Sequence, residues 1–220
     1  MRVALLGHGT VLDAIEGECR ARGWTIALRT PEPTDPATLR QADVGFAARY
    51  RHILTPDHLA TCPVLNVHNG YLPWNKGAHP NVWPLIDGSP AGVTVHWMDE
   101  GVDTGPIVAQ QRVEVLPTDT AETLYQRLEA EAVVLVREFF KFNDQHPMMA
   151  LKGALQDPQA GSRHYARELA ALDRVDMGHY EHEYGFEELL NRLRARTFTG
   201  YPGLRIGNVR ATITLTPVEE

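Results

Sequence analysis

A chain of 220 residues is long enough for one large domain, or for a domain with a small appendage. Hydrophobic residues make up 43% and charged residues 22%, which is typical of globular proteins and excludes disorder over most of the chain. The net charge of −7 gives the protein no general attraction to phosphate backbones, so we expect no nucleic-acid partner.

Signals for membranes and export are missing from the sequence. No apolar run approaches the roughly 20 residues that span a bilayer, and the opening MRVALLGHGT is too short in apolar residues for a signal peptide. Cys19 and Cys62 allow at most one disulfide, and two free thiols fit a reducing compartment better. The sequence therefore predicts a cytoplasmic protein with no membrane partner.

Short apolar runs alternate with helical patterns in the first part of the chain, which predicts an α/β fold. We expect strands at Val3–Leu6, Thr25–Leu28, Val44–Ala48, Val64–His68, Val93–Met98 and Ile107–Val115. Thr10 is positioned to cap a first helix that ends near Gly23. The longest helix is expected between Asp119 and Phe142, with Asp119 and Glu122 as its N-terminal capping pair.

After a break at 143–147 the pattern changes, so we divide the chain into a catalytic domain over 1–146 and a small appendage over 147–220. Within the appendage, Phe186, Leu189, Leu190 and Leu193 predict one apolar helix face. Leu204–Ile206 and Ala211–Leu215, separated by Gly207-Asn208, predict a closing β-hairpin.

Several smaller motifs have an ordinary structural interpretation beside a functional one. Gly7-His8-Gly9-Thr10 joins a strand to a helix, where it could form a tight turn or contact an anion, but Leu12 replaces the third glycine of a dinucleotide fingerprint. His179 and His182 could share a metal, although no third ligand stands at a suitable spacing. Arg192, Arg194 and Arg196 predict either an ion-paired helix face or a phosphate contact.

The most informative stretch runs from residue 65 to residue 110. Asn66 and His68 lie two residues apart at the end of a predicted strand, so both side chains project from the same side. The carboxyl end of a strand is where open α/β sheets place their active sites. A later loop, Asp99-Glu100-Gly101-Val102-Asp103, places three carboxylates within five positions. We expect an amide, an imidazole and a carboxylate to converge at neighbouring strand ends.

These motifs together resemble the folate-dependent formyltransferase superfamily. The resemblance rests on Asn66-Val67-His68 with Tyr71-Leu72-Pro73, on Gly92-Val93-Thr94-Val95-His96, and on Asp103-Thr104-Gly105-Pro106. Arg51-His52-Ile53-Leu54-Thr55-Pro56 is similar to the segment that contacts the pterin in that family. The resemblance implies a Rossmann-like domain with a mostly parallel sheet, here followed by a small C-terminal helix and β-hairpin appendage.

The same resemblance implies a reaction and a catalytic set. Asn66, His68 and Asp103 would move a formyl group from 10-formyltetrahydrofolate to an amine, and no metal is required. Asn66 would donate a hydrogen bond to the formyl oxygen, His68 would move the amine proton, and Asp103 would orient the imidazole. The folate-binding residues are expected to be His52, Ile53, Leu54, Asp99 and Glu100.

Two further segments favour one branch of this superfamily. LPWNKGAHPN (Leu72 to Asn81) and the late Leu193-Arg194-Ala195-Arg196-Thr197-Phe198 look most like nucleotide-linked amino-sugar N-formyltransferases, which are commonly dimers. Trp74, Lys76 and Arg196 are then the expected substrate contacts, and a homodimer active in lipopolysaccharide or O-antigen biosynthesis is the expected context. His79 stands where the sugar enzymes often carry Asp, which leaves the sugar, its amine position and its nucleotide open.

Four other functions remain as alternatives. A methionyl-tRNA or aminoacyl N-formyltransferase would be expected to carry a longer, basic C-terminal region, and a glycinamide ribonucleotide enzyme would leave the region beyond the long helix unexplained. A formyltetrahydrofolate hydrolase would use the same three residues with water as the acceptor. A binding module without activity would not need the amide, imidazole and carboxylate together.

Overall fold

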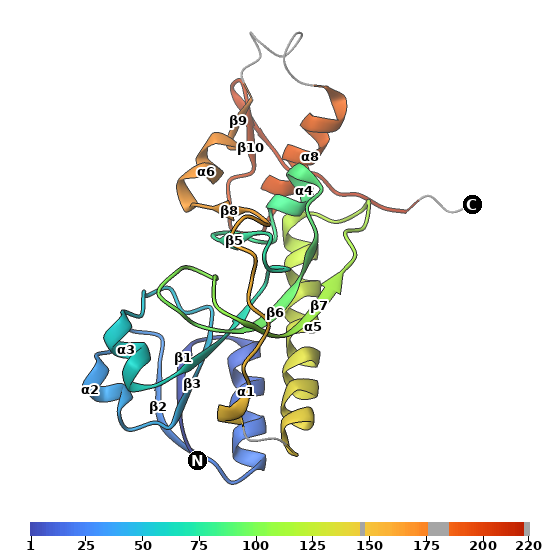
Figure 1. Cartoon of the computed structure of the whole chain (residues 1–220). Helices are drawn as coiled ribbons and strands as arrows, with labels where there is room; N and C mark the ends of the chain where they lie inside the picture. The colour runs from blue at the N-terminus through green and yellow to red at the C-terminus, as the bar shows by residue number, and fades with distance from the viewer. Residues whose placement is uncertain (146–147, 176–184, 218–220) are drawn as a thin grey trace.

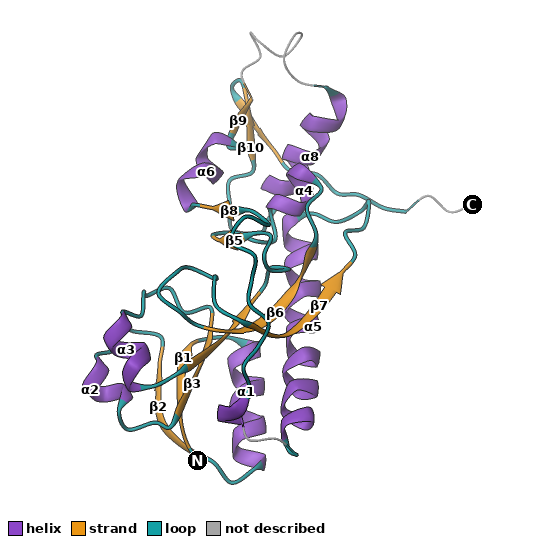
Figure 2. Cartoon of the chain, in the orientation of Figure 1, coloured by secondary structure: helices purple, strands orange, loops and turns teal. Residues whose placement is uncertain are grey.

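The computed structural model describes residues 1–145, 148–175 and 185–217. Its centre is a six-stranded sheet in the order β2-β1-β3-β4-β6-β7 (Figures 1 and 2). The strands are β1 (Arg2–Gly7), β2 (Thr25–Thr30), β3 (Val44–Ala48), β4 (Val64–His68), β6 (Ala91–Trp97) and β7 (Ile107–Val113). The first four pair in parallel, whereas β6 and β7 continue the sheet antiparallel. This is the mostly parallel α/β sheet that the sequence predicts.

Helices cover both faces of the sheet because its central strands are apolar on both sides. α1 (Thr10–Ala21) packs beside α5 (Ala121–Asn143) on one face, where a large core includes Leu5, Phe46 and Phe140. α2 (Pro36–Leu39) and α3 (Pro56–Thr61) flank the other face, over a smaller core that includes Leu6 and Val64. Figure 2 shows α1 and α5 side by side, with α2 and α3 on the opposite side of the strands.

Apart from η1 (Met148–Ala150), which Figure 1 shows at the level of α1, the remaining elements lie beyond one end of the sheet. They are β5 (Lys76–Gly77), α4 (Trp83–Asp87), β8 (Arg163–His164), α6 (Ala166–Ala171), β9 (Arg174–Val175), α8 (Phe186–Arg196), β10 (Leu204–Ile206) and β11 (Val209–Ala211). β5 pairs with β8, and α4 packs against α8. Elements from both sides of residue 146 thus share contacts, and the domain boundary there stays a prediction.

Both predicted helix caps are wrong in detail. Gly9 is the residue before α1, and Thr10 is the first helical residue, with its hydroxyl donating to Glu129 instead. At α5 the capping box is formed by Thr120 and Thr123. Asp119 accepts hydrogen bonds from the Leu116 backbone N–H and from Arg127. Neighbouring hydroxyls and carboxylates compete for the same free backbone groups, and tertiary partners decide between them.

The C-terminal predictions need two corrections. Phe186 is 78% exposed at the start of α8, whereas Leu189, Leu190 and Leu193 on the same helix face are partly buried. The second strand of the hairpin is Val209–Ala211, which begins directly after Gly207-Asn208 instead of at Ala211. His179 and His182 lie outside the described residues.

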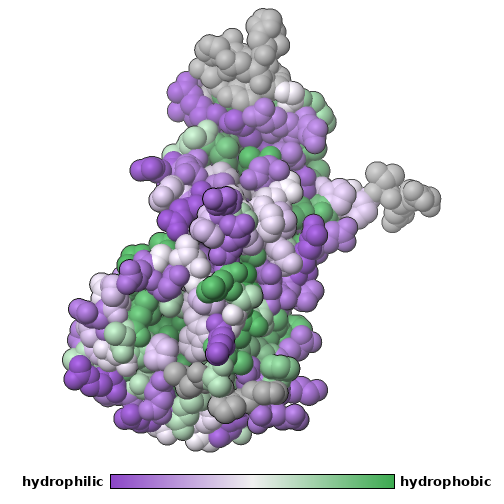
Figure 3. All heavy atoms as spheres, viewed as in Figure 1, coloured by the Kyte–Doolittle hydropathy of each residue, from purple (hydrophilic) through white to green (hydrophobic). Residues whose placement is uncertain are grey.

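No described helix has the length and apolarity to cross a membrane. Figure 3 shows hydrophilic residues over much of the visible face, with smaller hydrophobic groups between them.

Candidate active site

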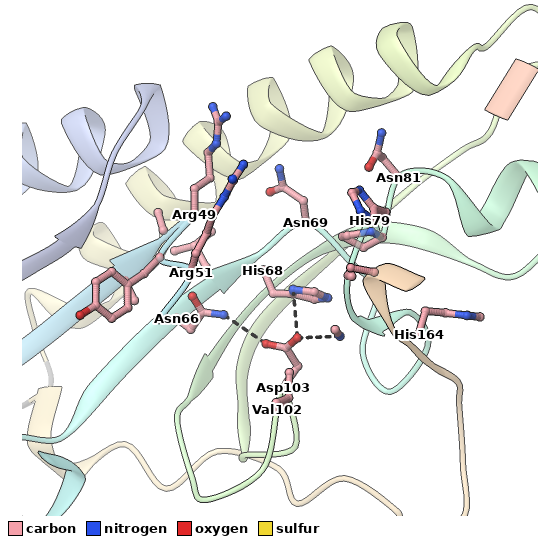
Figure 4. Close-up of a pocket in the computed structure, with 18 of the residues that line it drawn as sticks. Arg49, Arg51, Asn66, His68, Asn69, His79, Asn81, Val102, Asp103 and His164 are labelled. Carbon is pink, nitrogen blue, oxygen red and sulfur yellow. Dashed lines mark hydrogen bonds and ion pairs between the residues drawn. The ribbon is translucent and has the colours of Figure 1, made fainter. Parts of the chain in front are cut away.

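A cavity of about 860 Å³ opens where the loops after β3 and β4 meet the loop after β6. Asn66 and His68 reach it from β4, and Asp103 reaches it from the loop between β6 and β7 (Figure 4). The predicted convergence of amide, imidazole and carboxylate is therefore present in the structure. β6 runs antiparallel to β4 and ends beside the start of β4, and the loop that follows β6 returns to place Asp103 against Asn66 and His68.

Asp103 contacts both Asn66 and His68. Its Oδ2 lies 3.5 Å from His68 Nδ1 and accepts a 2.8 Å hydrogen bond from the Gly77 backbone N–H. Its Oδ1 lies 3.5 Å from His96 Nε2 and 3.4 Å from Asn66 Nδ2. Burial by itself would raise the pKa of Asp103, but the two histidines and the Gly77 N–H outweigh it and hold the pKa well below its usual range. The carboxylate is thus ionised at any pH near neutrality.

The protonation of His68 is constrained at one nitrogen. Nε2 lies 2.9 Å from the backbone carbonyl of Asn75, and because a carbonyl can only accept, Nε2 must carry a proton. Nδ1 faces Asp103 and is the nitrogen that can gain or lose a proton. Gly70 is necessary for this geometry, since a Cβ there would lie 2.5 Å from His68 Nε2.

His96 is a member of the site that the sequence interpretation missed. It lies directly opposite Asn66 in the β4–β6 register and is buried. Its Nδ1 donates to the Trp97 carbonyl at 2.8 Å, and its Nε2 lies 3.1 Å from Asn66 Nδ2. When the ring is neutral, Nε2 can accept from Asn66 and orient the amide; when Nε2 carries a proton, that proton faces the Asp103 carboxylate. The motif containing His96 was visible in the sequence, but its register against Asn66 was not.

The residues predicted to bind folate line the same cavity. His52, Ile53 and Leu54 come from the loop after β3, and Asp99 and Glu100 come from the loop after β6. Ile53 is 71% exposed and Leu54 is buried. One oxygen of Asp99 is occupied within its own loop, where it accepts from the Gly101 N–H at 3.0 Å and from the Thr104 hydroxyl at 2.6 Å.

The three residues that were predicted to contact the substrate do not lie together in the structure. Arg196 is buried, lines the cavity and forms an ion pair with Asp173. Trp74 and Lys76 lie outside the cavity lining. Lys76 is buried in β5, where burial and then the nearby Arg163 lower its pKa. The short pairing of β5 with β8 fixes this position, and the sequence around Lys76 gave no sign of that pairing.

The smaller motifs are explained by local structure. Gly7 and Gly9 have φ of 108° and 97°, and a Cβ on Gly7 would lie 1.9 Å from the Ala48 carbonyl oxygen, so a tight turn requires glycine there. On α8, Arg192 pairs with Glu188, and Arg194 donates to the Leu116 and Asp119 carbonyls. These two arginines fit the ion-paired and structural interpretation.

The cavity lining includes a group of basic residues that the sequence interpretation did not assemble. Arg51 follows β3, His79 follows β5, and Arg196 ends α8. Burial, then Arg196 and then Arg51, lower the pKa of His79, so its imidazole is neutral near pH 7. Both arginines lower the pKa of His79, so two residues that lie far apart in the sequence place positive charge near this imidazole.

Comparisons with known proteins agree with this geometry. The similar solved structures include a sugar N-formyltransferase from Shewanella sp. FDAARGOS_354 (18% identity, TM-score 0.83, 100% of this chain and 99% of that one). They also include the formyltransferase PseJ from Anoxybacillus kamchatkensis in complex with UDP-4,6-dideoxy-4-formamido-L-AltNAc and tetrahydrofolate (29% identity, TM-score 0.67, 78% of this chain and 89% of that one). The first shows a shared fold over the whole chain.

Curated relatives include two kinds of formyltransferase. The methionyl-tRNA formyltransferase of Myxococcus xanthus is 34% identical over 80% of this chain and 54% of its own length. The dTDP-4-amino-4,6-dideoxyglucose formyltransferase of Mycobacterium bovis is 35% identical over 60% of this chain and 54% of its own length. The chain thus spans about half the length of these relatives. A family model described as formyl transferase matches residues 19–138. The chain therefore belongs to the formyl transferase family.

Proposed function

We propose that this protein transfers a formyl group from 10-formyltetrahydrofolate to the amine of a nucleotide-diphosphate-linked amino sugar. The observation that carries the proposal is the set of Asn66, His68 and Asp103 around one cavity, with Asp103 within 3.5 Å of both others. An amide donor, a titratable imidazole and an ionised carboxylate are the groups that amine acylation needs. A binding module would have no use for the three together.

The donor is proposed to lie between the His52–Leu54 segment and the 99–103 loop. Both line the cavity, and the exposed Ile53 with the buried Leu54 can cover an aromatic ring. Backbone N–H and C=O groups of the two loops can form hydrogen bonds with the donors and acceptors along the edge of a pterin. The structure of PseJ contains tetrahydrofolate, which supports a folate donor in this family.

Asn66 and His68 would act on the two reacting groups. The donor supplies an activated formyl carbon, and the formyl oxygen gains negative charge as the amine attacks. The 3.4 Å contact from Asn66 Nδ2 to Asp103 is long, so that N–H is available to the formyl oxygen. His68 Nδ1 would take the amine proton while the Asn75 carbonyl holds the ring, and would return that proton to N10 of the tetrahydrofolate as the bond between N10 and the formyl carbon breaks. Asp103 stabilises the resulting imidazolium.

The acceptor assignment is supported by the charge of the cavity. A protein with a net charge of −7 repels a nucleotide diphosphate overall, so local positive groups are needed to hold one. Arg51 and Arg196, the second of which also pairs with Asp173, place such groups in the cavity lining, and neutral His79 can exchange hydrogen bonds with sugar hydroxyls. We infer that the phosphates bind toward Arg51 and Arg196 and that the amine points toward His68.

The relatives favour two acceptor classes. The M. bovis relative acts on a dTDP-linked amino sugar, and PseJ is bound to a UDP-linked formamido sugar. The M. xanthus relative, at similar identity, is a methionyl-tRNA enzyme. The acidity of this chain argues against RNA, because binding RNA depends on neutralising its phosphates. The amino sugar is therefore the acceptor that we propose, with methionyl-tRNA as the rival.

The test is a panel of acceptors offered with 10-formyltetrahydrofolate. Thymidine-, uridine- and guanosine-diphosphate amino sugars are each incubated with the enzyme and examined by mass spectrometry. We expect at least one to gain the mass of one CO on its amine, and methionyl-tRNA to remain unmodified. Formylation of methionyl-tRNA with no change in any sugar would show that the acceptor is wrong and the catalytic set right.

A further inference from the structure

The segment that follows α5 runs back along the sheet and contacts the loop that holds Asp103. In Figure 1 this orange segment passes in front of β6 before it reaches β8. Ala154 and Ile107 exchange two backbone hydrogen bonds of 2.7 and 2.8 Å, directly beside the end of the loop. Arg163 donates to the Val102 carbonyl at 3.3 Å. Residues 154–163 thus contact the 99–105 loop and the start of the strand that follows it.

Gln156 makes the most specific contact in this segment. Its Nε2 donates to the Asp103 carbonyl at 3.0 Å and to the Gly105 carbonyl at 2.8 Å. The amide orientation is fixed, because turning it over would place Oε1 against two carbonyl oxygens. Oε1 is buried and has no hydrogen-bond partner among the described residues. Gln156 therefore donates to the carbonyls of Asp103 and Gly105, while its own side-chain oxygen has no hydrogen-bond partner among the described residues.

The conformation of Asp103 shows why the loop needs such a contact. Asp103 has φ of 56°, in the left-handed region that side chains other than glycine seldom adopt. Gly105 approaches so closely that a Cβ there would lie 1.9 Å from the Trp97 carbonyl oxygen. A strained residue at a site persists only where its surroundings determine the conformation. Two hydrogen bonds to the carbonyls of residues 103 and 105 provide that constraint.

We propose that Gln156 is a positioning residue that holds the Asp103 carboxylate against His68 and His96. It contacts the backbone of Asp103 and acts on the reaction through that carboxylate. The inference rests on the proposed function, in which Asp103 stabilises the His68 imidazolium. It adds a role for the region beyond α5, since that region supplies the contact that sets the catalytic geometry.

The first test compares Gln156→Met with Gln159→Met. Methionine has a similar length to glutamine but no N–H donor, and Gln159 is an exposed residue of the same segment. We expect Gln156→Met to lower kcat about 10- to 100-fold, because small displacements of a catalytic group have effects of that size. The Gln159→Met enzyme should keep its kcat. A folded Gln156→Met enzyme with unchanged kcat would overturn the proposal.

A double-mutant cycle separates positioning from a general structural effect. If Gln156 acts through the Asp103 carboxylate, Gln156→Met should cost little further activity in an Asp103→Asn background. The same fold-loss in both backgrounds would contradict the proposal, because it would mean that Gln156 acts independently of the carboxylate.

A spectroscopic measurement on the protein without substrates keeps this inference separate from the proposed function. The side-chain ¹⁵N signals of His68, assigned with His68→Gln, should shift in Gln156→Met and stay in place in Gln159→Met. The signals of His58, which caps α3 away from the site, serve as an internal reference. Shifted His68 signals in an enzyme that formylates no amino sugar would support the positioning role and reject the acceptor. Unshifted His68 signals would reject the positioning role, whatever the acceptor.

Discussion

Replacing His68 with glutamine is expected to lower kcat by about 100-fold or more, the usual scale for loss of a general acid–base group. Glutamine fills much of the same space and can still donate to the Asn75 carbonyl, but it cannot accept a proton at neutral pH. Steady-state kinetics with saturating donor and amino sugar provide the measurement.

The matched control is His8→Gln, because His8 is an exposed histidine outside the cavity lining. That variant should retain its kcat. If His68→Gln is folded and turns over at a rate close to that of the unaltered enzyme, His68 is not the group that moves the amine proton.

Replacing Asp103 with asparagine is expected to lower kcat by a similar factor, because an asparagine cannot stabilise the imidazolium that forms on His68. KM for the donor should change less than kcat, since the carboxylate acts when charge develops on His68. Glu114→Gln removes an exposed carboxylate after β7 and is the matched control. Equal kcat for Asp103→Asn and Glu114→Gln would contradict the role of Asp103.

The lowered pKa of Asp103 also predicts a pH dependence of stability. The unfolded chain protonates an aspartate near its ordinary pKa of about 3.9, whereas the folded protein holds this carboxylate ionised to lower pH. Its contribution to stability is thus fully present above about pH 4 and is lost as the pH falls further. Urea denaturation at pH 6 and pH 3 should show the difference in free energy of unfolding between the unaltered protein and Asp103→Asn becoming smaller at pH 3.

Much of the sheet could be predicted from sequence because its strands are short, continuous apolar runs with clear ends. Val44–Ala48 and Val64–His68 have the predicted bounds. The first residues of α1 and α5 were harder to predict. Near Thr10 and Asp119, several neighbouring side chains can bond to the same free backbone groups. Phe186 shows another limit, because periodicity indicates which residues share a helix face and does not show where the packing partner ends.

The convergence of Asn66, His68 and Asp103 could be predicted because these residues belong to short motifs at strand ends. His96 could not be assigned, since its role depends on the register that places it opposite Asn66. The contact of Gln156 with Asp103 could not be predicted either, because the two residues are 53 positions apart in the sequence. The position of Lys76 could not be predicted for a related reason: the pairing of β5 with β8 buries it outside the cavity lining.

The fate of the formyl group tests the central claim most directly. The enzyme is supplied with 10-formyltetrahydrofolate labelled with ¹⁴C in the formyl group, with and without the amino sugar that the panel selects. We expect tetrahydrofolate to form only when the sugar is present, with one labelled formamide for each tetrahydrofolate released. Labelled formate appearing at the same rate without any amine would show a hydrolase and would contradict the proposed transfer to an amino sugar.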